Sequence, residues 1–442
     1  MKRLFGAYAY GEGPRAGCWW DETADVPEFP ALVQDERTDV AIIGAGFTGL
    51  VAALELARAG VRVSVIEAKR IGWGASGRNG GFCCLGGGML EDAALDKRFG
   101  RKGRIDFRRT ELAAVQFVDA LIGELGLDVD RHSDGETVLA HRPKDVATLK
   151  SHATVLRENY GVEHEFIAAH ALADRGLAGP FHGALTIQAG FGLNPRKYLG
   201  GLVDAAIRAG VKLYENSPAS SVDREAEGWA LQVGELVLRA DQVVLATNGY
   251  SSENIPDWFA GRYLPSQSNV IVTRPLSQDE LDAAGWTSTQ MAYDTRNLLH
   301  YFRLMPDNRF LFGLRGGVFT GPHAEQRARA KARRDLDRMF PAWSAVETPH
   351  SWSGMVCLAR NMLPFVGAVP DHDGLWAGMC YHGNGIAMGS YSGALLAQLV
   401  QGKQPDLPYP DAIRAPLKRF ELGRFRRAAM PFAYGAFMLA DR

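Results

Sequence analysis

Three glycines in the segment "GAGFTG" stand at the spacing G-x-G-x-x-G, as Gly44, Gly46 and Gly49. In a dinucleotide-binding turn the first glycine permits a tight turn, the second lets the backbone approach a pyrophosphate, and the third lets a helix pack closely on a strand. A helix that begins at Phe47 and Thr48 presents free N–H groups and a partial positive charge to the phosphates. We therefore predict that this turn binds the pyrophosphate of a dinucleotide.

Glu67 follows this turn after about 20 residues, beside Ala68 at the end of a second apolar stretch. A carboxylate in this place accepts hydrogen bonds from ribose hydroxyls and disfavours the 2′-phosphate of NADP. It does not separate NAD from FAD. The alternative, that the glycines only allow tight packing, explains neither the acidic residue nor its context.

The stretch "GWGASGRNGG", residues 72–81, contains five glycines and almost no side chains that could pack in a core. No second G-x-G-x-x-G follows it, so we interpret it as a loop around the far half of the same cofactor. Its polar side chains would reach the pyrophosphate and the edge of a flat ring, and its glycines would turn backbone N–H groups toward that ring. The alternative is a flexible surface loop, which usually carries more Ser, Asp and Lys. The predicted cofactor contacts are Gly74, Ala75, Ser76, Arg78, Asn79, Gly80 and Gly81.

The elements that position these segments follow from hydrophobic periodicity. Strands over 38–46 and 61–68 flank a helix over 47–60 and give a βαβ unit. Further helices are predicted over 104–126, 143–160, 195–210, 323–340 and 386–402, and further strands over 135–142, 211–219 and 228–250. Alternation within 265–320 predicts an antiparallel sheet. The first 35 residues are predicted to form an extended arm, in which Trp19 and Trp20 either pin the arm to the body or cover a pocket.

The fold class is therefore α/β, or α+β, with a Rossmann-type domain interleaved with a substrate domain on an antiparallel sheet covered by helices. We assign residues 1–98, 195–250 and 352–404 to the cofactor domain. Residues 99–194 and 251–351 form the substrate domain, and 405–442 form a tail that packs on the body.

Composition limits the possible partners. A formal net charge of −1 argues against nucleic acid or an anionic membrane as partner. The uncharged run over 40–54 is shorter than the roughly 20 apolar residues that span a bilayer. Five cysteines, an odd number, indicate the reducing cytoplasm rather than a disulfide framework. Cys83 and Cys84 lack metal-ligand spacing, so we predict no metal site.

The segments "DVAIIGAGFTGL", "IEAKRIGWGASGRNGGF", "VVLATNGY", "LPFVG" and "YHGNGIAMGSYSGALLAQLVQG" occur in the order seen in the D-amino-acid oxidase-like superfamily of FAD-dependent oxidoreductases. The chain resembles this superfamily from about residue 20 onward. It is most similar to the γ-glutamylputrescine oxidase-like and glycine–sarcosine oxidase group, on "GASGRNGG", residues 294–313 and the Pro-rich tail. It departs from that group in having "YHGNG" instead of Gly-His-Gly, and in the adjacent Cys83 and Cys84.

The resemblance implies FAD and oxidation at a carbon that bears an amine. It places Ala219, Thr247, Asn248 and Gly249 at the cofactor. Reduced flavin is negative near N1 and the C2 carbonyl, and the N–H groups before the helix over 386–402 would stabilise that charge. The residues predicted to do so are Gly383, Asn384, Gly385 and Ile386; alternatively, they only form a loop before a core helix. We expect non-covalent FAD, with a thioether through Cys357 as the alternative.

Candidate substrate residues lie on the predicted strand "HYFRLM" and nearby. Tyr301 and Arg303 are two residues apart and share one face of the strand, where Arg303 would anchor a substrate carboxylate and Tyr301 would form a wall. The alternative is an exposed Arg303 beside a core tyrosine. Further candidates are Arg296 and Arg360 for the same anion, and Tyr250 and His382 for the pocket lining.

These observations predict an FAD-dependent oxidoreductase that oxidises the C–N bond of a small primary or secondary amine or amino acid. The substrate would be of the γ-glutamylputrescine, N-alkyl amino acid or cyclic imino acid type. Hydride transfer to flavin N5 gives an imine, which water hydrolyses, and H2O2 forms if O2 is the acceptor. The alternatives are an amine dehydrogenase that reduces a quinone or a protein, an NAD-dependent dehydrogenase, and a catalytically silent FAD-binding subunit.

Overall fold

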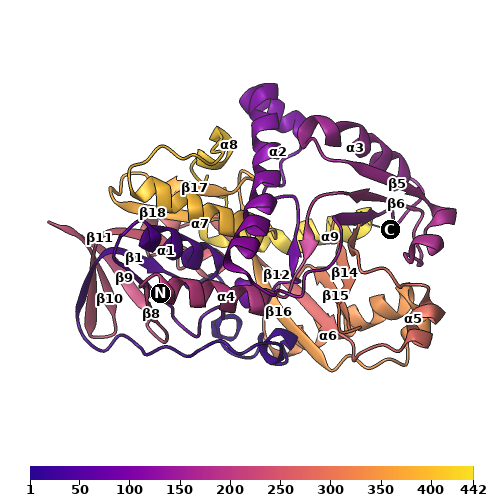
Figure 1. Ribbon diagram of the computed structural model, residues 1–442, viewed down its shortest axis with the longest axis horizontal. Coiled ribbons are helices and arrows are strands. Elements are labelled where there is room, and N and C mark those ends of the chain that lie inside the picture. The colour runs from indigo at the N-terminus through magenta and orange to yellow at the C-terminus, as the bar shows by residue number, and fades with distance from the viewer. Residues whose placement is uncertain (442) are drawn as a thin grey trace.

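Two eight-stranded sheets organise the chain, and a computed structural model describes residues 1–441 of it. In Figure 1 the first sheet lies on the left with α1 and α7, and the second lies on the right with α5 and α6. The long helix α2, Asp92–Leu125, stands between them. The predicted fold class is confirmed, because one sheet is mainly parallel and the other mainly antiparallel.

The first sheet has the strand order β17-β18-β11-β1-β2-β8, and β9 and β10 extend it through β11. Its central pairs, β1 with β11 and β1 with β2, are parallel. Its strands are β1 Glu36–Ile43, β2 Val63–Ile66, β8 Lys212–Tyr214, β9 Ala219–Glu225, β10 Gly228–Val233, β11 Leu236–Leu245, β17 Phe365–Ala368 and β18 Leu375–Met379. The apolar sequence of β2 fits a strand that is buried on both faces.

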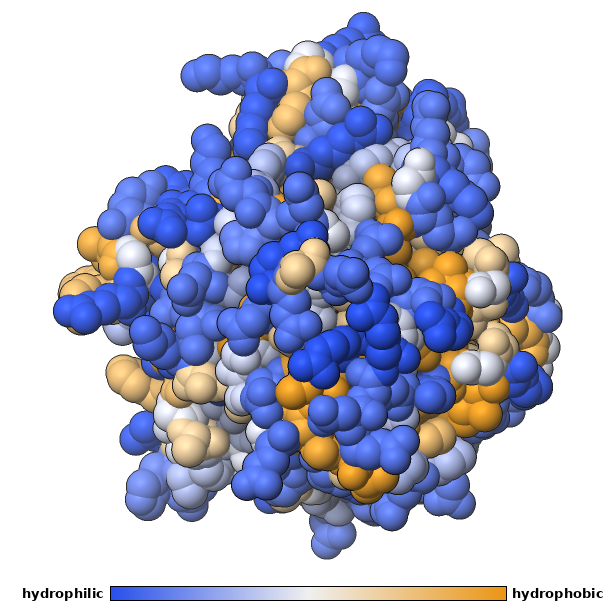
Figure 2. Space-filling view, turned by 90° about the vertical axis from the view of Figure 1, so that its left-hand side faces the viewer, coloured by the Kyte–Doolittle hydropathy of each residue, from blue (hydrophilic) through white to orange (hydrophobic). Residues whose placement is uncertain are grey.

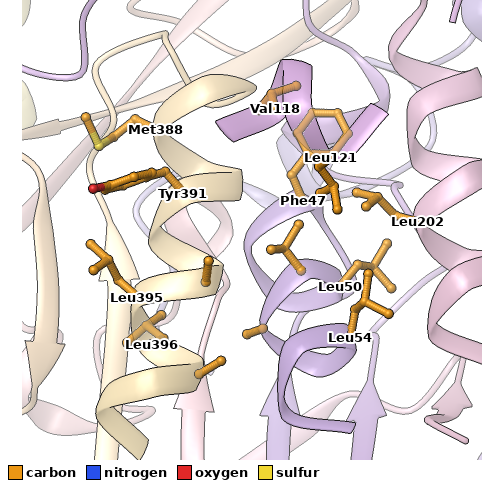
Figure 3. Close-up of a cluster of buried hydrophobic side chains, with 14 of the residues drawn as sticks. Phe47, Leu50, Leu54, Val118, Leu121, Leu202, Met388, Tyr391, Leu395 and Leu396 are labelled. Atoms are coloured by element: carbon orange, nitrogen blue, oxygen red, sulfur yellow. The ribbon is translucent and has the colours of Figure 1, made fainter. Parts of the chain in front are cut away.

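Three helices cover one face of this sheet: α1 Phe47–Arg58, α4 Pro195–Arg208 and α7 Ala387–Val400. Figure 3 shows Leu50 and Leu54 of α1 between Leu202 of α4 and Leu396 of α7. Because α1 packs on helices on both sides and on the sheet, most of its residues are buried. Helix α4 begins where the sequence predicts, with the Asn194 side chain accepting hydrogen bonds from the first turn.

The second sheet has the order β16-β12-β15-β14-β13-β4-β6-β5, in which β13 and β4 pair in parallel and the other neighbours are antiparallel. Its strands are β4 Glu136–Leu139, β5 His164–Ala168, β6 Gly183–Ile187, β12 Tyr263–Val272, β13 Met291–Asp294, β14 His300–Leu304, β15 Phe310–Arg315 and β16 His350–Ala359. One face carries the aromatic core around Phe302 and Trp286, under α5 Gln278–Ala284 and α6 Pro322–Met339. The other face packs against α3 Asp145–Asn159 over β4 and β6, and Tyr301 on it lies against Gly80 of the glycine-rich loop over 72–81.

Short elements complete the fold. They are β3 Phe82–Cys83, β7 Phe191–Gly192, α3 Asp145–Asn159, α8 Asp411–Arg414, α9 Met430–Ala440, and the 3-10 turns η1 Ala7–Tyr10, η2 Trp19–Glu22, η3 Ala75–Gly77, η4 Ala169–Ala171, η5 Ala173–Arg175, η6 Asn248–Tyr250, η7 Asp257–Phe259, η8 Pro341–Trp343 and η9 Gly423–Ala429. Helix α2 begins earlier than predicted, and α9 in the tail was not predicted. The domain boundaries stay a prediction; the one at residue 352 falls inside β16.

The N-terminal arm is fastened to the loop over 72–81. Trp20 is buried, and its indole N–H donates to the Asn79 carbonyl over 2.8 Å. The Arg15 guanidinium donates to the carbonyls of Gly72 and Trp73 at 3.1 and 3.0 Å. Trp20 therefore pins the arm to the body.

The side of the molecule that carries β9 and β10 is mostly hydrophilic, with apolar side chains in separate groups (Figure 2). Within residues 1–441, no helix is both long and apolar enough to cross a membrane. In the same range, no group of three or more His, Cys, Asp or Glu side chains has an arrangement that would hold a metal ion.

The contact between α1 and α7 gives a prediction for stability. A Cβ atom at Gly393 would lie 2.5 Å from the Thr48 carbonyl oxygen, so Gly393→Ala must push the two helices apart. We expect a loss of about 1–3 kcal/mol in the free energy of unfolding, measured by urea denaturation.

Gly123→Ala is the matched control, because a Cβ atom at that exposed position in α2 meets nothing within 4 Å. It should be neutral or gain up to about 1 kcal/mol, since alanine is the better helix former. Equal stabilities for the two variants would contradict close packing between α1 and α7.

Candidate functional site

A cavity of about 390 Å³ runs between the two sheets. The βαβ turn, the loop over 72–80 and the segment over 383–386 line one part of it, and β4, β13, β14 and β15 line another. All the residues predicted to hold the cofactor line this cavity except Gly49, Gly81 and Gly249. A Cβ atom at Gly49 would lie 2.0 Å from the Gly44 carbonyl oxygen, so this glycine serves the packing of helix on strand.

The glycine turn and the acidic residue lie side by side at the end of β1. The Glu67 carboxylate accepts hydrogen bonds from the backbone N–H groups of Ala45 and Lys69, both at 3.0 Å. Burial raises the pKa of Glu67 above its usual range. Ser76 of the glycine-rich loop accepts from the Phe47 N–H at 3.0 Å, which ties this loop to the start of α1. A ribose and a pyrophosphate fit this arrangement of a carboxylate beside a helix N-terminus.

Arg78 is the buried cation of the glycine-rich loop. Its Nε donates to the Trp73 carbonyl at 2.8 Å and Nη1 to the Ser353 carbonyl at 3.2 Å. Its guanidinium lies over the rings of Trp73 and Tyr250, at 4.1 and 5.3 Å from their centroids. Nη2 is buried without a hydrogen-bond partner in the described part of the chain, and Arg78 lines the cavity. An acceptor atom of a cofactor would satisfy this donor.

His382 has both ring nitrogens occupied. Nδ1 donates to the Gly87 carbonyl at 2.8 Å, and Nε2 accepts from the Ala359 N–H at 3.1 Å. Burial lowers the pKa of His382 to about 4, so the ring is neutral near pH 7. His382 therefore lines the cavity as predicted, but its ring joins three chain segments instead of offering a nitrogen to a substrate.

The second sheet contributes a row of polar side chains to the cavity. Tyr293 on β13 is opposite Tyr301 on β14, which is opposite Gly313 on β15. Arg315 lies two residues beyond Gly313, and Glu136 lies two residues before the position on β4 opposite Tyr293. Paired residues and residues two apart share a face of a sheet. The register thus brings Glu136, Tyr293, Tyr301 and Arg315 to the cavity face.

Arg315 is the guanidinium that reaches the cavity from this sheet. Its Nη2 donates to the His382 carbonyl at 3.1 Å, and none of the carboxylates in residues 1–441 forms an ion pair with it. Burial lowers the pKa of Arg315 from its usual value. Tyr301 lies beside it, with its hydroxyl 2.9 Å from Ser268 Oγ. Arg315 is therefore a cavity-lining guanidinium without a carboxylate partner among residues 1–441.

Arg303, which the sequence placed at the substrate, does not line the cavity. Its Nη1 lies 2.8 Å from His132 Nε2, and its Nη2 donates to the Leu193 carbonyl at 2.8 Å. Gly81 and Gly192 leave room for the guanidinium, because a Cβ atom at either position would lie within 2.7 Å of it. Burial lowers the pKa of Arg303 to about 9. Arg303 therefore lies against Gly81 at the end of the glycine-rich loop and bonds to His132 and Leu193 instead of facing the cavity.

The weaker arginine candidates also lie elsewhere. Arg360 is on the surface, where its Nε is 2.8 Å from both carboxylate oxygens of Glu421. Arg296 pairs with Asp294. Tyr250 lines the cavity, and its hydroxyl accepts from the Met355 N–H at 3.3 Å. The sequence analysis did not identify Arg315 or Glu136 as cavity residues. Arg315 lies near the end of the predicted strand "RFLFGLRG", and its strand β15 is separated from Tyr293 on β13 by β14 alone.

Cys357 lines the cavity and lies near a second thiol. Its Sγ is 3.5 Å from Cys380 Sγ, and both cysteines are free. A thioether between Cys357 and the cofactor stays a prediction.

Residues 39–399 match the protein family described as "DAO: FAD dependent oxidoreductase". The chain is 29% identical over 427 residues to "Probable oxidoreductase OrdL" of Rhizobium meliloti, covering 96% of this chain and 97% of that one. It is 29% identical over 418 residues to "Gamma-glutamylputrescine oxidoreductase" of Escherichia coli, covering 94% and 95%.

Two solved structures share the fold at low sequence identity. Glycine oxidase from Geobacillus kaustophilus has a TM-score of 0.71 at 21% identity, covering 87% of this chain and 100% of that one. Iminodiacetate oxidase from Chelativorans sp. BNC1 has a TM-score of 0.69 at 19% identity, covering 85% and 98%.

The orphaned donor of Arg78 predicts a loss of cofactor affinity on substitution. Arg78→Met keeps the stem over Trp73 and removes the charge and the donors. A hydrogen bond to a charged group contributes about 1.5–3 kcal/mol, so FAD should bind roughly 10- to 100-fold more weakly. Fluorescence titration of the apoprotein with FAD measures this change.

Arg360→Met is the control, since its ion pair with Glu421 is exposed. It should leave FAD affinity unchanged. Wild-type affinity in Arg78→Met would show that the free Nη2 does not face the cofactor.

Proposed function

Because the chain belongs to the DAO family of FAD-dependent oxidoreductases, we propose that it oxidises the C–N bond of a small primary or secondary amine or amino acid that carries an anionic group. The observation that carries this proposal is Arg315, a cavity-lining guanidinium with no carboxylate partner in the described residues. The names of its relatives support an amine substrate, since they include a γ-glutamylputrescine oxidoreductase and glycine oxidases.

The residues around the cavity fit FAD. The βαβ turn over 44–48 and Glu67 would hold the pyrophosphate and ribose, and the loop over 72–80 with Arg78 would hold the ring. N–H groups over 383–386, before α7, would face the edge that becomes negative on reduction. When bound, the flavin supplies the acceptor for the hydride that leaves the carbon next to nitrogen.

The chain's own residues then bind and orient the substrate. Arg315 would form a bidentate pair with the anionic group, and Tyr301 and Ser268 would form the wall beside it. His382 would take no proton, because both its nitrogens are engaged and its pKa is near 4. The amine would therefore bind in its neutral form, and the imine that forms would be hydrolysed by water.

We propose O2 as the electron acceptor, with H2O2 as the product; the alternatives are a quinone or a protein acceptor. A catalytically silent subunit is the other alternative. The family assignment does not support the NAD-dependent dehydrogenase. All five cysteines are free thiols, which supports a reducing cytoplasmic location in this proposal.

An anaerobic screen tests the proposal. Amines with and without a carboxylate are mixed with the purified holoprotein, and flavin absorbance is followed at about 450 nm. We expect bleaching by an amine with a carboxylate, such as γ-glutamylputrescine, sarcosine or proline, and H2O2 on admission of air. Flavin that dithionite bleaches and no amine bleaches would support the silent subunit instead.

Arg315→Met should impair use of the best substrate from this screen. Removing one partner of a desolvated charge pair costs about 2–5 kcal/mol, so kcat/KM should fall by roughly 30-fold or more, mainly through KM. The flavin should stay bound. Steady-state kinetics with the purified variant measures the effect.

Arg274→Met, which removes a partly exposed ion pair between the segment after β12 and Glu280 of α5, should keep wild-type kinetics. A normal KM in Arg315→Met would remove Arg315 from the site. A raised KM in Arg303→Met with an intact flavin spectrum would indicate that Arg303, and not Arg315, binds the anionic group of the substrate.

A further inference from the structure

Exposed apolar side chains gather in the C-terminal segment of the molecule. Among residues 1–441, more than half of the exposed large hydrophobic side chains belong to Phe319 and to residues 422–439. Helix α9 contains no charged residue, and Phe432 on it is 81% exposed. Single exposed apolar residues are ordinary, but a group of them is typical of a binding surface. We call this group the tail patch: Phe319, Leu422, Phe425, Phe432, Phe437, Met438 and Leu439.

Two arginines fasten the segments that carry the tail patch. Arg427 Nη2 donates to the carbonyl of Val318 at 2.8 Å, which brings Phe319 to the same place as the tail. Arg426 is buried, and its Nε donates to the Tyr263 carbonyl at 2.7 Å. The backbone of the patch is therefore held against the body while its apolar side chains stay exposed.

Helix α9 is also attached along its length. Tyr434 forms a hydrogen bond with Ser266 of β12 through their hydroxyls. The Asp441 carboxylate accepts from the N–H groups of Asn297 at 2.8 Å and Leu298 at 3.1 Å. Figure 1 shows α9 beside the second sheet, in agreement with these contacts. The exposed side chains of α9 thus belong to a docked helix and not to a loose tail.

Cations without carboxylate partners lie among the apolar residues of the patch. Residues 414–427 contain six Lys and Arg and one Glu, whose carboxylate is already paired. Lys418, Arg419 and Arg424 are exposed, and no carboxylate within residues 1–441 forms an ion pair with them. The Arg424 guanidinium lies 4.6 Å from the centroid of the Phe425 ring. Positive charge and apolar surface therefore occupy the same part of the molecule.

The positive charge of this segment is hidden in the average for the chain. The formal net charge of −1 sums over all 442 residues and does not describe 414–427. Arg262, which is partly buried, lies close enough to respond to the tail: burial lowers its pKa, and the charge of Arg419 lowers it further. A locally positive surface attracts an anionic partner whatever the charge of the whole chain.

An apolar surface of this kind fits either a second copy of the chain or a lipid surface. In a symmetric dimer the patch would face itself, so Lys418, Arg419 and Arg424 would approach the same cations of the other copy. An anionic bilayer satisfies both features, because apolar side chains enter the headgroup region while cations meet lipid charges. Helix α9 has 11 residues, too few to span a bilayer, and would lie on its surface.

We propose that the tail patch and its cations bind the surface of a membrane that contains anionic lipids. Phe425 and Phe432 enter the headgroup region, and Lys418, Arg419 and Arg424 contact the lipid phosphates. The attachment is peripheral and reversible. It involves neither the amine nor the flavin, so it stands independently of the proposed function.

Vesicle flotation of the purified holoprotein tests the proposal. One set of vesicles contains phosphatidylcholine alone, and the other contains equal parts of phosphatidylcholine and phosphatidylglycerol. Three cations near an anionic surface should make binding to the mixed vesicles at least about 10-fold tighter. In about 1 M NaCl, where the screening length falls to roughly 3 Å, this preference should disappear.

Two variants separate the apolar and the charged contributions. Phe432→Ser should weaken binding to the mixed vesicles about 10-fold, because one phenyl ring no longer leaves water. Arg419→Gln combined with Arg424→Gln should weaken it by a similar factor, roughly 10-fold, and reduce its salt dependence. All three side chains are exposed, so the flavin spectrum and Tm should stay those of the wild type.

Val33→Ser and Arg208→Gln are the matched controls. Val33 is an apolar residue outside the patch that is 79% exposed, and Arg208 on α4 is an exposed arginine with no ion pair within residues 1–441. Both variants should bind as the wild type does. Equal binding to the two kinds of vesicle, or unchanged binding in Phe432→Ser, would overturn the proposal. A dimer in sedimentation velocity that Phe432→Ser dissociates would also overturn it, since the patch would then bind a second copy.

Discussion

The loop over 72–81 lies beside the cavity between the two sheets, and the cavity depends on its having almost no side chains. Its backbone fills a space between the βαβ turn and β14 that side chains would close: a Cβ atom at Gly80 would lie 2.7 Å from the Tyr301 ring. A loop that consists largely of glycine has few side chains whose packing could hold it in one conformation. Buried groups from other segments therefore hold it: Arg15 and Trp20 of the arm donate to its carbonyls, and the Leu193 N–H donates to the Gly81 carbonyl.

This arrangement gathers cations in the interior without matching carboxylates. Arg78 and Arg303 donate to backbone carbonyls, and His132 next to Arg303 has its pKa lowered to about 3 and is neutral. A buried guanidinium whose partners are carbonyl dipoles keeps most of its positive field. The interior around Arg78 and Arg303 is thus locally positive, which favours an anionic ligand, although the whole chain carries a formal net charge of only −1.

The sequence predicted the βαβ unit, most helices and the antiparallel sheet, because hydrophobic periodicity and glycine spacing are local signals. It did not distinguish Arg303 from Arg315. Alternation correctly put Tyr301 and Arg303 on one face, but which arginine reaches the cavity depends on strand pairing and on the space left by Gly81 and Gly192. These are contacts between residues far apart in the sequence. His382 was found at the cavity, but its two hydrogen bonds to Gly87 and Ala359 also come from distant segments.

The charged groups of the cavity gain from being apart. Were Glu136 next to Arg315, the two would pair, and the empty cavity would be more stable but closed to charged ligands. Two intervening strands, β13 and β14, keep Glu136 and Arg315 separate. The cost of burying each group is offset differently: Glu136 holds a proton, and Arg315 donates a hydrogen bond to the His382 carbonyl.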